Sequence, residues 1–478
     1  GEIVMDIAGS VKPTLEISGG TLDVTNWRIT TAASKAGAKP AVSGGKFTSA
    51  VPESYCADGY VPTKNEDGTY GVKVDDSVAE VGGVKYLSLQ AAIDAVPNIT
   101  SSTVDAPTVK LLADTKENVT ISKQYKLIID LNGHTLNGGT EKGKPALTVN
   151  NKRVTIIDSS EAKTGTIMRE DTAENSGVSS HYVIDVQGNY AFLKIEGGNV
   201  TNNSGNDAGK GASLIRLGND SVSAWPTLTI TGGKFTQDNF IAIKVDRGTL
   251  HSLSGEITSA NSYAIENWNT AYIKGGTVNG TVASWTYSGG SNSTTTITGG
   301  TIDGDVASVS YDNAAGKTAK VTISGGTVTG TLGTYTYSNG LVPLEDPAKA
   351  TIGVTGGTFV EDPTKYVVEG SAVKGNTDGT YGVEKAYLAK VGDTSYYTMD
   401  EAFHAAVASG ETLHLLRDYT TSAVQNSGSK SFTIDLSGHT WTYTGSDVNS
   451  AAFEINYPNV TLTVMNGTVV SSSMVGLI

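Results

Sequence analysis

The fold is decided by a recurring phrase of one apolar residue, one polar residue and two glycines, which reads Ile273-Lys-Gly-Gly276, Ile297-Thr-Gly-Gly300, Ile323-Ser-Gly-Gly326 and Val354-Thr-Gly-Gly357. Earlier copies end at Gly20, Gly45, Gly198 and Gly233, and a degenerate copy reads Leu253-Ser-Gly-Glu256. From Gly233 onward the phrase recurs at a spacing of roughly 20 to 30 residues, which is typical of one coil of a solenoid.

Short runs of alternating apolar and polar residues, such as Leu228-Thr-Ile230, fill each repeat between Gly, Asn and Asp residues. This pattern predicts short strands joined by turns. A Gly-Gly pair between two strand halves permits positive φ, and therefore a sharp corner, at the same place in every coil. We predict an all-β fold, and more specifically a right-handed parallel β-helix.

The composition of the 478 residues excludes several classes of protein. Hydrophobic residues make up 38% and charged residues 17%, and the net charge is -14. An acidic chain repels nucleic acid, so we expect no nucleic-acid partner. No run of about 18 apolar residues occurs, so we expect no membrane insertion. The single cysteine, Cys56, permits neither an intrachain disulfide nor a Cys-cluster metal site, and we expect it to be a small buried hydrophobic residue.

Two segments depart from the strand pattern. Residues 84–97 contain an N-cap candidate, Ser88, then an apolar stripe and a stop at Pro97, which predicts one short helix. A second helix is predicted over residues 397–407, where Thr398 and Glu401 form a capping box. Both helices precede strand patterns, so we expect them to cap a sheet.

A hairpin signal also occurs twice, at Asp67-Gly68 and at Asp378-Gly379. The repeated helix and hairpin divide the chain into the end of one β-helix module (1–77), a complete module (78–385) and the start of a third (386–478). Short helices and C-terminal hairpins would cover the open strand edges of each module. The two partial modules suggest head-to-tail self-association between molecules.

An aromatic strip is the main candidate site. Trp285, Val309 and Tyr335 share one lateral position on three successive coils, and two residues later in each coil come Tyr287, Tyr311 and Tyr337. On an outward face these rings would form a flat surface that stacks on sugars, with ring spacing near 4.8 Å. An internal stack or a purely stabilising ladder is the alternative.

Other residues have simpler interpretations. Asp303, Asp305 and Asp312 are potential Ca²⁺ ligands, but they lack the dense acidic spacing of a calcium loop, so we expect no metal. His134 and His439 occupy equivalent turns in the two repeats, and we expect a structural role for both.

An enzyme is the alternative class, since β-helices include polysaccharide lyases and glycoside hydrolases. Glycosidases need carboxylates gathered in one groove. Asp130, Asp158 and Asp185 recur at nearly equal intervals and would align on successive coils, with Arg153 and Arg169 nearby.

The whole chain resembles a known kind of repeat module through its structural phrases, Gly356-Gly-Thr-Phe359, Asp378-Gly-Thr-Tyr-Gly-Val383 and Ile129-Asp-Leu-Asn-Gly-His-Thr-Leu136. The modules it resembles belong to large secreted or wall-attached, adhesin-like proteins of gut Firmicutes and Actinobacteria. The resemblance implies a pectin-lyase-like β-helix at the outer surface or cell wall of a bacterium, and it brings no catalytic residues.

We therefore expect a non-enzymatic stalk or adhesin without cofactor, whose partner is a glycan or a host surface protein. A polysaccharide lyase or glycoside hydrolase of the pectin-lyase-like class remains the alternative.

Overall fold

The computed structural model describes the chain apart from residues 7–13, 31–32, 34–36, 38, 102, 142, 171–181, 204–212, 220–224, 239, 288, 312–315, 339–341, 344–347, 427, 446–451 and 472–478. The chain forms two compact units, Gly1–Val78 and Ala79–Ile478. Strands dominate both units, which confirms the predicted all-β class. The three predicted modules and their boundaries stay predictions.

The first unit is a small β structure closed by a hairpin. Its strands are β1 (Glu2–Met5), β2 (Leu15–Leu22), β3 (Asn26–Ile29), β4 (Pro40–Phe47), β5 (Tyr60–Lys64) and β6 (Tyr70–Val74). β2 and β4 pair in parallel, and β5 and β6 form the hairpin predicted at Asp67-Gly68. Cys56 is buried in the core of this unit, as predicted, and burial raises the pKa of its thiol.

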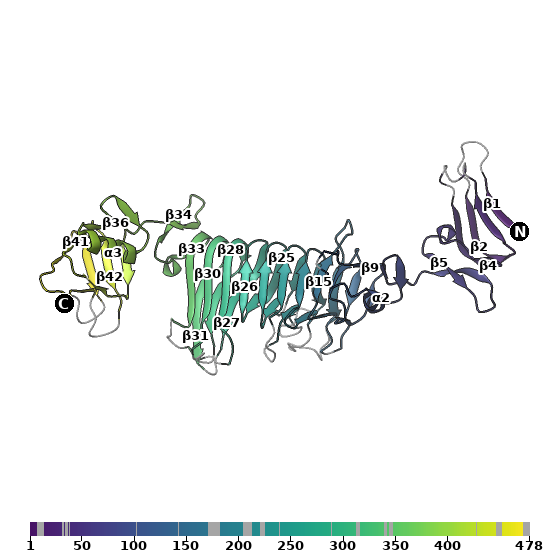
Figure 1. Cartoon of the computed structure of the whole chain (residues 1–478), viewed down its shortest axis with the longest axis horizontal. Helices are drawn as coiled ribbons and strands as arrows, with labels where there is room; N and C mark the ends of the chain where they lie inside the picture. Colours follow the sequence, from purple (N-terminus) through teal and green to yellow (C-terminus); the bar gives the residue numbers. More distant parts are fainter. Residues whose placement is uncertain are drawn as a thin grey trace. The chain divides into compact units, whose positions relative to one another are not determined.

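The second unit contains three ladders of parallel strands (Figure 1). The first ladder consists of β9 (Thr108–Leu111), β12 (Lys126–Asp130), β15 (Arg153–Ile157), β18 (Phe192–Ile195), β21 (Thr227–Ile230), β24 (Thr249–Ser252), β26 (Thr270–Ile273), β28 (Ser293–Asp303), β30 (Ala319–Val328) and β33 (Ala350–Phe359). Along each strand, inward residues such as Ile297 are buried, and outward residues such as Thr296 are partly exposed.

The other two ladders follow the same rule, that each strand pairs with its equivalent in the next repeat. The second ladder consists of β10 (Thr115–Lys116), β13 (Thr135–Asn137), β16 (Thr166–Glu170), β19 (Asn199–Asn203), β22 (Lys234–Gln237) and parts of β25 (Glu256–Asn267), β27 (Thr277–Thr286), β28, β30 and β33. The third ladder consists of β11 (Val119–Ile121), β14 (Leu147–Asn150), β17 (Ile184–Gln187), β20 (Ile215–Leu217), β23 (Ile243–Val245), the ends of β25 and β27, β29 (Val306–Ser310) and β31 (Leu332–Ser338).

The Gly-Gly corners lie where the first ladder turns into the second. The second glycine has positive φ in every predicted copy, at Gly20, Gly45, Gly198, Gly233, Gly276, Gly300, Gly326 and Gly357. The first glycine is required by close approach, because a Cβ on Gly232 would lie 2.2 Å from the carbonyl oxygen of Glu196 in the preceding coil. The degenerate copy was misaligned by one residue. Gly255, with φ of 93°, takes the second-glycine position, and Glu256 pairs with Lys234.

Antiparallel strands stand at both ends of the ladders. β7 (Ala79–Val81) pairs antiparallel with β8 (Val84–Tyr86) and with β9, and the helix α2 (Leu89–Ala95) packs beside them. At the other end β33 pairs antiparallel with β35 (Tyr381–Lys385), which forms the predicted hairpin with β34 (Ser371–Gly375). The predicted N-cap is confirmed, since the Ser88 hydroxyl accepts from the Ala91 amide.

The segment after β35 repeats the start of the ladders. Its elements are β36 (Ala389–Val391), β37 (Thr394–Tyr396), α3 (Met399–Ser409), β38 (Leu413–Leu415), β39 (Tyr419–Thr421), β40 (Gln425–Asn426), β41 (Phe432–Asp435), β42 (Thr440–Tyr443), β43 (Phe453–Glu454), β44 (Leu462–Met465) and β45 (Thr468–Ser471). β36 pairs antiparallel with β38, as β7 does with β9, and β38 pairs parallel with β41. One half of the predicted capping box forms, because the Thr398 hydroxyl accepts from the Glu401 amide; the same hydroxyl donates to the Glu401 carboxylate.

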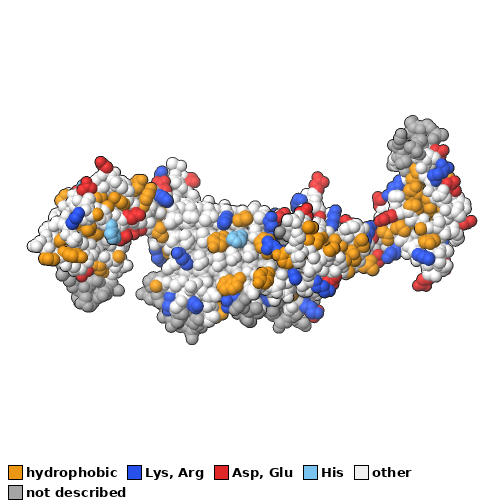
Figure 2. Space-filling model, in the orientation of Figure 1, with side chains coloured by type: hydrophobic (Ala, Val, Ile, Leu, Met, Phe, Trp, Pro, Cys, Tyr) orange, Lys and Arg blue, Asp and Glu red, His pale blue; other side chains and the backbone are white. Residues whose placement is uncertain are grey.

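Uncharged polar atoms cover most of the surface over β26, β28 and β30 on the face shown in Figure 2. Nowhere in the described chain is a helix both long enough and apolar enough to cross a bilayer.

Candidate functional site

Trp285, Tyr335 and Tyr337 of the predicted strip lie on the third ladder, and Tyr287 and Tyr311 directly follow its strands β27 and β29. Trp285 of β27 pairs with Val309 of β29, and Val309 pairs with Tyr335 of β31. Their predicted shared lateral position is therefore confirmed. The next residues, Thr286, Ser310 and Thr336, also pair in register. They directly precede the second row of aromatic residues, Tyr287, Tyr311 and Tyr337.

Small residues occupy the lateral position two residues before this aromatic row. Ala283, Ala307 and Gly333 pair in register on the three strands. Alternate residues of a strand face the same side, so the small residues and the aromatic row share one face. The buried Val282 and Val306 face the interior instead. A row of small residues beside a row of large ones leaves a trough along the ladder.

This trough is a groove of about 600 Å³. The groove passes over Ala307, with Trp285 and Val309 along one side and Asp305 and residues 259–262 along the other. Tyr263 packs against Ala283 and meets Trp285 edge to face, with ring centroids 5.9 Å apart. Tyr263 therefore covers the floor at one end of the groove.

Tyr335 and Tyr337 line the groove at the β31 end. Their rings are nearly parallel, at 4° and with centroids 6.4 Å apart. The Tyr335 ring lies over its own backbone, because a Cβ on Gly333 would come within 2.5 Å of the phenol oxygen and 2.6 Å of ring carbons. The Tyr335 side chain is 45% exposed. A glycine at this place therefore lets an exposed aromatic ring lie across the strand.

The five predicted ligand residues do not act as one strip. Trp285, Tyr335 and Tyr337 line the groove, whereas Tyr287 and Tyr311 are not among its described lining residues. Tyr287 instead meets Trp268 edge to face at 5.5 Å. Because Val309 lies between Trp285 and Tyr335 on the ladder, the aromatic rings do not form a continuous stack from coil to coil.

Two aromatic residues near the groove were missed from the sequence. Trp268 stacks on Trp285 with centroids 5.4 Å apart and an interplanar angle of 29°. Trp268 directly follows Asn267, which pairs with Ser284, so continuing the row of Trp285, Val309 and Tyr335 to the preceding coil would have identified it. Tyr263 lies beside a break in the β25–β27 register, between Thr258 and Ile265, and residue spacing does not reveal such a bulge.

The groove carries little charge. Asp305 is exposed, and its Oδ1 accepts from the backbone amide and the hydroxyl of Thr331 at 2.7 and 2.8 Å. No lysine or arginine is found among the described residues that line the groove. Burial, together with the nearby Glu266 carboxyl, raises the pKa of Tyr263 to about 12, so its phenol stays protonated at neutral pH.

A row of charged residues precedes the small residues on the same ladder. Asp185, Arg216, Lys244 and Glu266 pair in register, and Glu266 pairs with Ala283. Arg216 binds Asp185 through two hydrogen bonds of 2.9 and 2.6 Å, and both side chains are largely buried. We call these four residues the charged row.

The carboxylates proposed for the enzyme alternative do not share a groove. Asp130 accepts the backbone amides of Asn132 and Ser159, and Asp158 accepts that of Gly165 among others. Asp130 is the last residue of the first-ladder strand β12 and Asp158 directly follows β15, whereas Asp185 belongs to the third ladder. The predicted alignment of the three is therefore wrong. Coil lengths vary, so nearly equal intervals along the chain do not return to the same strand.

The remaining candidates have local partners. His134 lies 3.5 Å from Asp114, and the equivalent His439 lies 3.5 Å from Asp418, which agrees with a repeated turn structure. Asp303 accepts from the Thr329 hydroxyl at 2.7 Å. Asp312 lies outside the described residues. In the described part of the chain, no group of three or more metal-binding side chains gathers.

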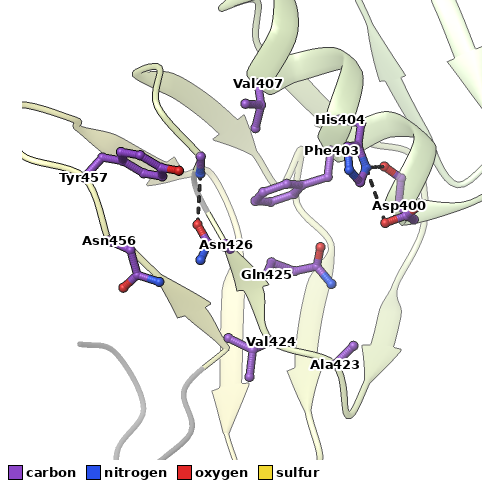
Figure 3. A pocket seen from close by; sticks show the side chains of 11 residues that line it. Asp400, Phe403, His404, Val407, Ala423, Val424, Gln425, Asn426, Asn456 and Tyr457 are labelled. Carbon is purple, nitrogen blue, oxygen red and sulfur yellow. Dashed lines mark hydrogen bonds and ion pairs between the residues drawn. The ribbon is translucent and has the colours of Figure 1, made fainter.

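A second cavity, of about 720 Å³, is lined by α3, by β40 and the residues beside it, and by Asn456 and Tyr457, which follow β43 (Figure 3). His404 lies 3.3 Å from Asp400 on its rim, and both side chains are about four-fifths exposed. At the start of the main ladders, Gln90 of α2 bonds to the backbone of Thr120 and so links the helix to the neighbouring strand β11. Asp400 occupies the equivalent position in α3, two residues after the N-cap, but its carboxylate pairs with His404 of the same helix. The cavity therefore lies where a side-chain bond joins helix and strand in the first copy.

Comparisons of the chain with protein-family models, with curated proteins and with solved structures find no match.

Proposed function

We propose that the three ladders form a right-handed parallel β-helix that serves as an extracellular module of a bacterial surface protein, either a stalk or an adhesin. The proposal is supported by the parallel pairing of each strand with its equivalent one repeat later. It is also supported by the antiparallel hairpins at both ends, which blunt the open edges. Such a module extends by adding coils and holds its surface rigidly.

The proposed activity is binding of carbohydrate in the groove. The observation that carries it is the arrangement of Trp285, Tyr335 and Tyr337 around the small floor residue Ala307. Aromatic faces pack against the apolar faces of sugar rings, and polar groups at the rim fix the orientation of hydroxyls. Asp305 and the tyrosine phenols supply such polar groups.

The test is binding of the labelled protein to an array of plant, mucin and microbial glycans. The doubly substituted Trp285→Ala, Tyr335→Ala variant should lose the binding. The matched control is Tyr125→Ala, Tyr190→Ala, which removes two exposed aromatic rings that lie outside the groove lining. Loss in the first variant alone supports the proposal. Absence of binding by the unaltered protein would reject it and favour a stalk or a protein-binding adhesin.

The placement of Asp130, Asp158 and Asp185 gives no support to a lyase or glycoside hydrolase. These carboxylates were the sequence-based reason for that alternative, and their oxygens are engaged by turn amides or by Arg216.

A further inference from the structure

Resting on the proposed function, we propose that the groove selects uncharged oligosaccharides of at least three sugar rings over glycans that carry carboxylate or sulfate groups. The inference depends on the charge of the lining, on the spacing of its aromatic rings and on the polar groups at its rim.

The charge of the lining favours an uncharged ligand. Proteins bind anionic sugars through arginine or lysine, which pair with carboxylate and sulfate oxygens. Among the described lining residues the charged group is Asp305, an exposed carboxylate. The nearest basic residue of the charged row, Lys244, is held by Asp246 at 3.2 Å and is mostly buried. An anionic sugar would therefore meet repulsion without a compensating cation.

The spacing of the rings sets a minimum length for the ligand. Trp285 and Tyr335 occupy one lateral position two strands apart, which corresponds to about 9.5 Å along the ladder. This distance is close to that between alternate rings of an extended sugar chain. A monosaccharide or disaccharide can contact one of the two aromatic surfaces, whereas a chain of three or more rings can contact both across Val309.

The rim suits sugar hydroxyls. The Oδ1 of Asp305 is already held by Thr331, which fixes the carboxylate and directs its other oxygen away from that contact. A carboxylate held in this way accepts hydrogen bonds from hydroxyl groups. The protonated phenol of Tyr263 can donate at the Trp285 end. Donors and acceptors are therefore both present without a positive charge.

The test is isothermal titration with two series of oligosaccharides of one to six rings, uncharged xylo-oligosaccharides and anionic galacturonic acid oligomers. For the unaltered protein we expect affinity for the uncharged series to rise by about tenfold from two rings to three, since a second aromatic contact is gained. The anionic series should bind at least about tenfold more weakly at equal length. A second uncharged series, cello-oligosaccharides, tests whether the groove prefers glucose to xylose units.

Variants separate selectivity from binding itself. Asp305→Lys should narrow the gap between the two series by about tenfold or more, whereas Glu361→Lys, an exposed carboxylate on another part of the chain, should leave it unchanged. Equal or tighter binding of the anionic series, or an unchanged gap in Asp305→Lys, would overturn the proposed selectivity and leave carbohydrate binding intact. Failure of all three series to bind would overturn both proposals.

Discussion

The third ladder presents two different surfaces at one lateral position. In its earlier strands this position is held by Asp185, Arg216, Lys244 and Glu266, whereas in the later strands it is held by Ala283, Ala307 and Gly333. At this lateral position the strands pair in parallel and in register. Long charged side chains close the surface, where Arg216 bonds to Asp185 and Lys244 lies 3.2 Å from Asp246, and small residues open it into a groove. A binding groove on this sheet therefore requires small residues beside the aromatic residues, and aromatic residues alone do not create one.

The largest effect is expected in the charged row. Arg216→Ala leaves the Asp185 carboxylate buried without its partner, which should lower the free energy of unfolding by about 3–5 kcal/mol. Denaturant unfolding measures the change. The control is Asp185→Leu combined with Arg216→Leu, which removes both charges and should recover most of the loss. A decrease in the free energy of unfolding of less than about 1 kcal/mol in Arg216→Ala would show that the charged row does not stabilise the pairing of these strands.

The next effect is expected in the groove. Ala307→Leu fills the floor between Trp285 and Tyr335, so affinity for a bound oligosaccharide should fall by about a hundredfold. The free energy of unfolding should fall by about 1–2 kcal/mol, because Ala307 is almost fully buried and the added atoms must displace its neighbours. Thr296→Leu, an outward position on the first ladder, is the control and should retain full affinity. Retained affinity in Ala307→Leu would contradict the groove as the binding site.

A smaller effect is expected from the glycine beneath Tyr335. A Cβ at position 333 would overlap the Tyr335 ring, so Gly333→Ala should displace the ring and lower affinity by about tenfold. Combining Gly333→Ala with Tyr335→Ala should cost no more than Tyr335→Ala alone, because both act through one ring. Additive losses in the double variant would mean that Gly333 acts by another route.

The smallest effect concerns the pH dependence of stability. Burial raises the pKa of Glu266, an effect opposed by Lys244, so the folded chain binds a proton here that the unfolded chain releases near its ordinary pKa. Stability due to Glu266 is therefore greatest in acid and falls as pH rises through the folded-state pKa. Glu266→Gln should remove this fall. Parallel pH profiles of unfolding free energy for the two proteins would contradict this expectation.

The sequence predicted the features that depend on local chemistry. The Gly-Gly corners, the N-caps at Ser88 and Thr398 and the two hairpins all follow from residues next to one another in the chain. The shared position of Trp285, Val309 and Tyr335 was also predictable, because these coils have similar sequences and turns.

The charged row and the groove wall were not predictable in the same way. From Asp185 to Gly333, successive residues at this lateral position lie at unequal intervals along the chain, since loops of different length separate the strands. Fixed spacing therefore placed Asp130 and Asp158 beside Asp185, although they lie on another ladder. Tyr263 lies at a register break, so only the three-dimensional structure brings its ring to Trp285.

The measurement that tests the central claim most directly is a crystal structure of the protein soaked with an uncharged xylotetraose or cellotetraose. If the groove binds carbohydrate, a sugar chain will lie along it over Ala307, with one ring packed on Trp285 and another on Tyr335. A sugar bound elsewhere while the groove stays empty of it would contradict the claim that the small residues of the third ladder create a carbohydrate site.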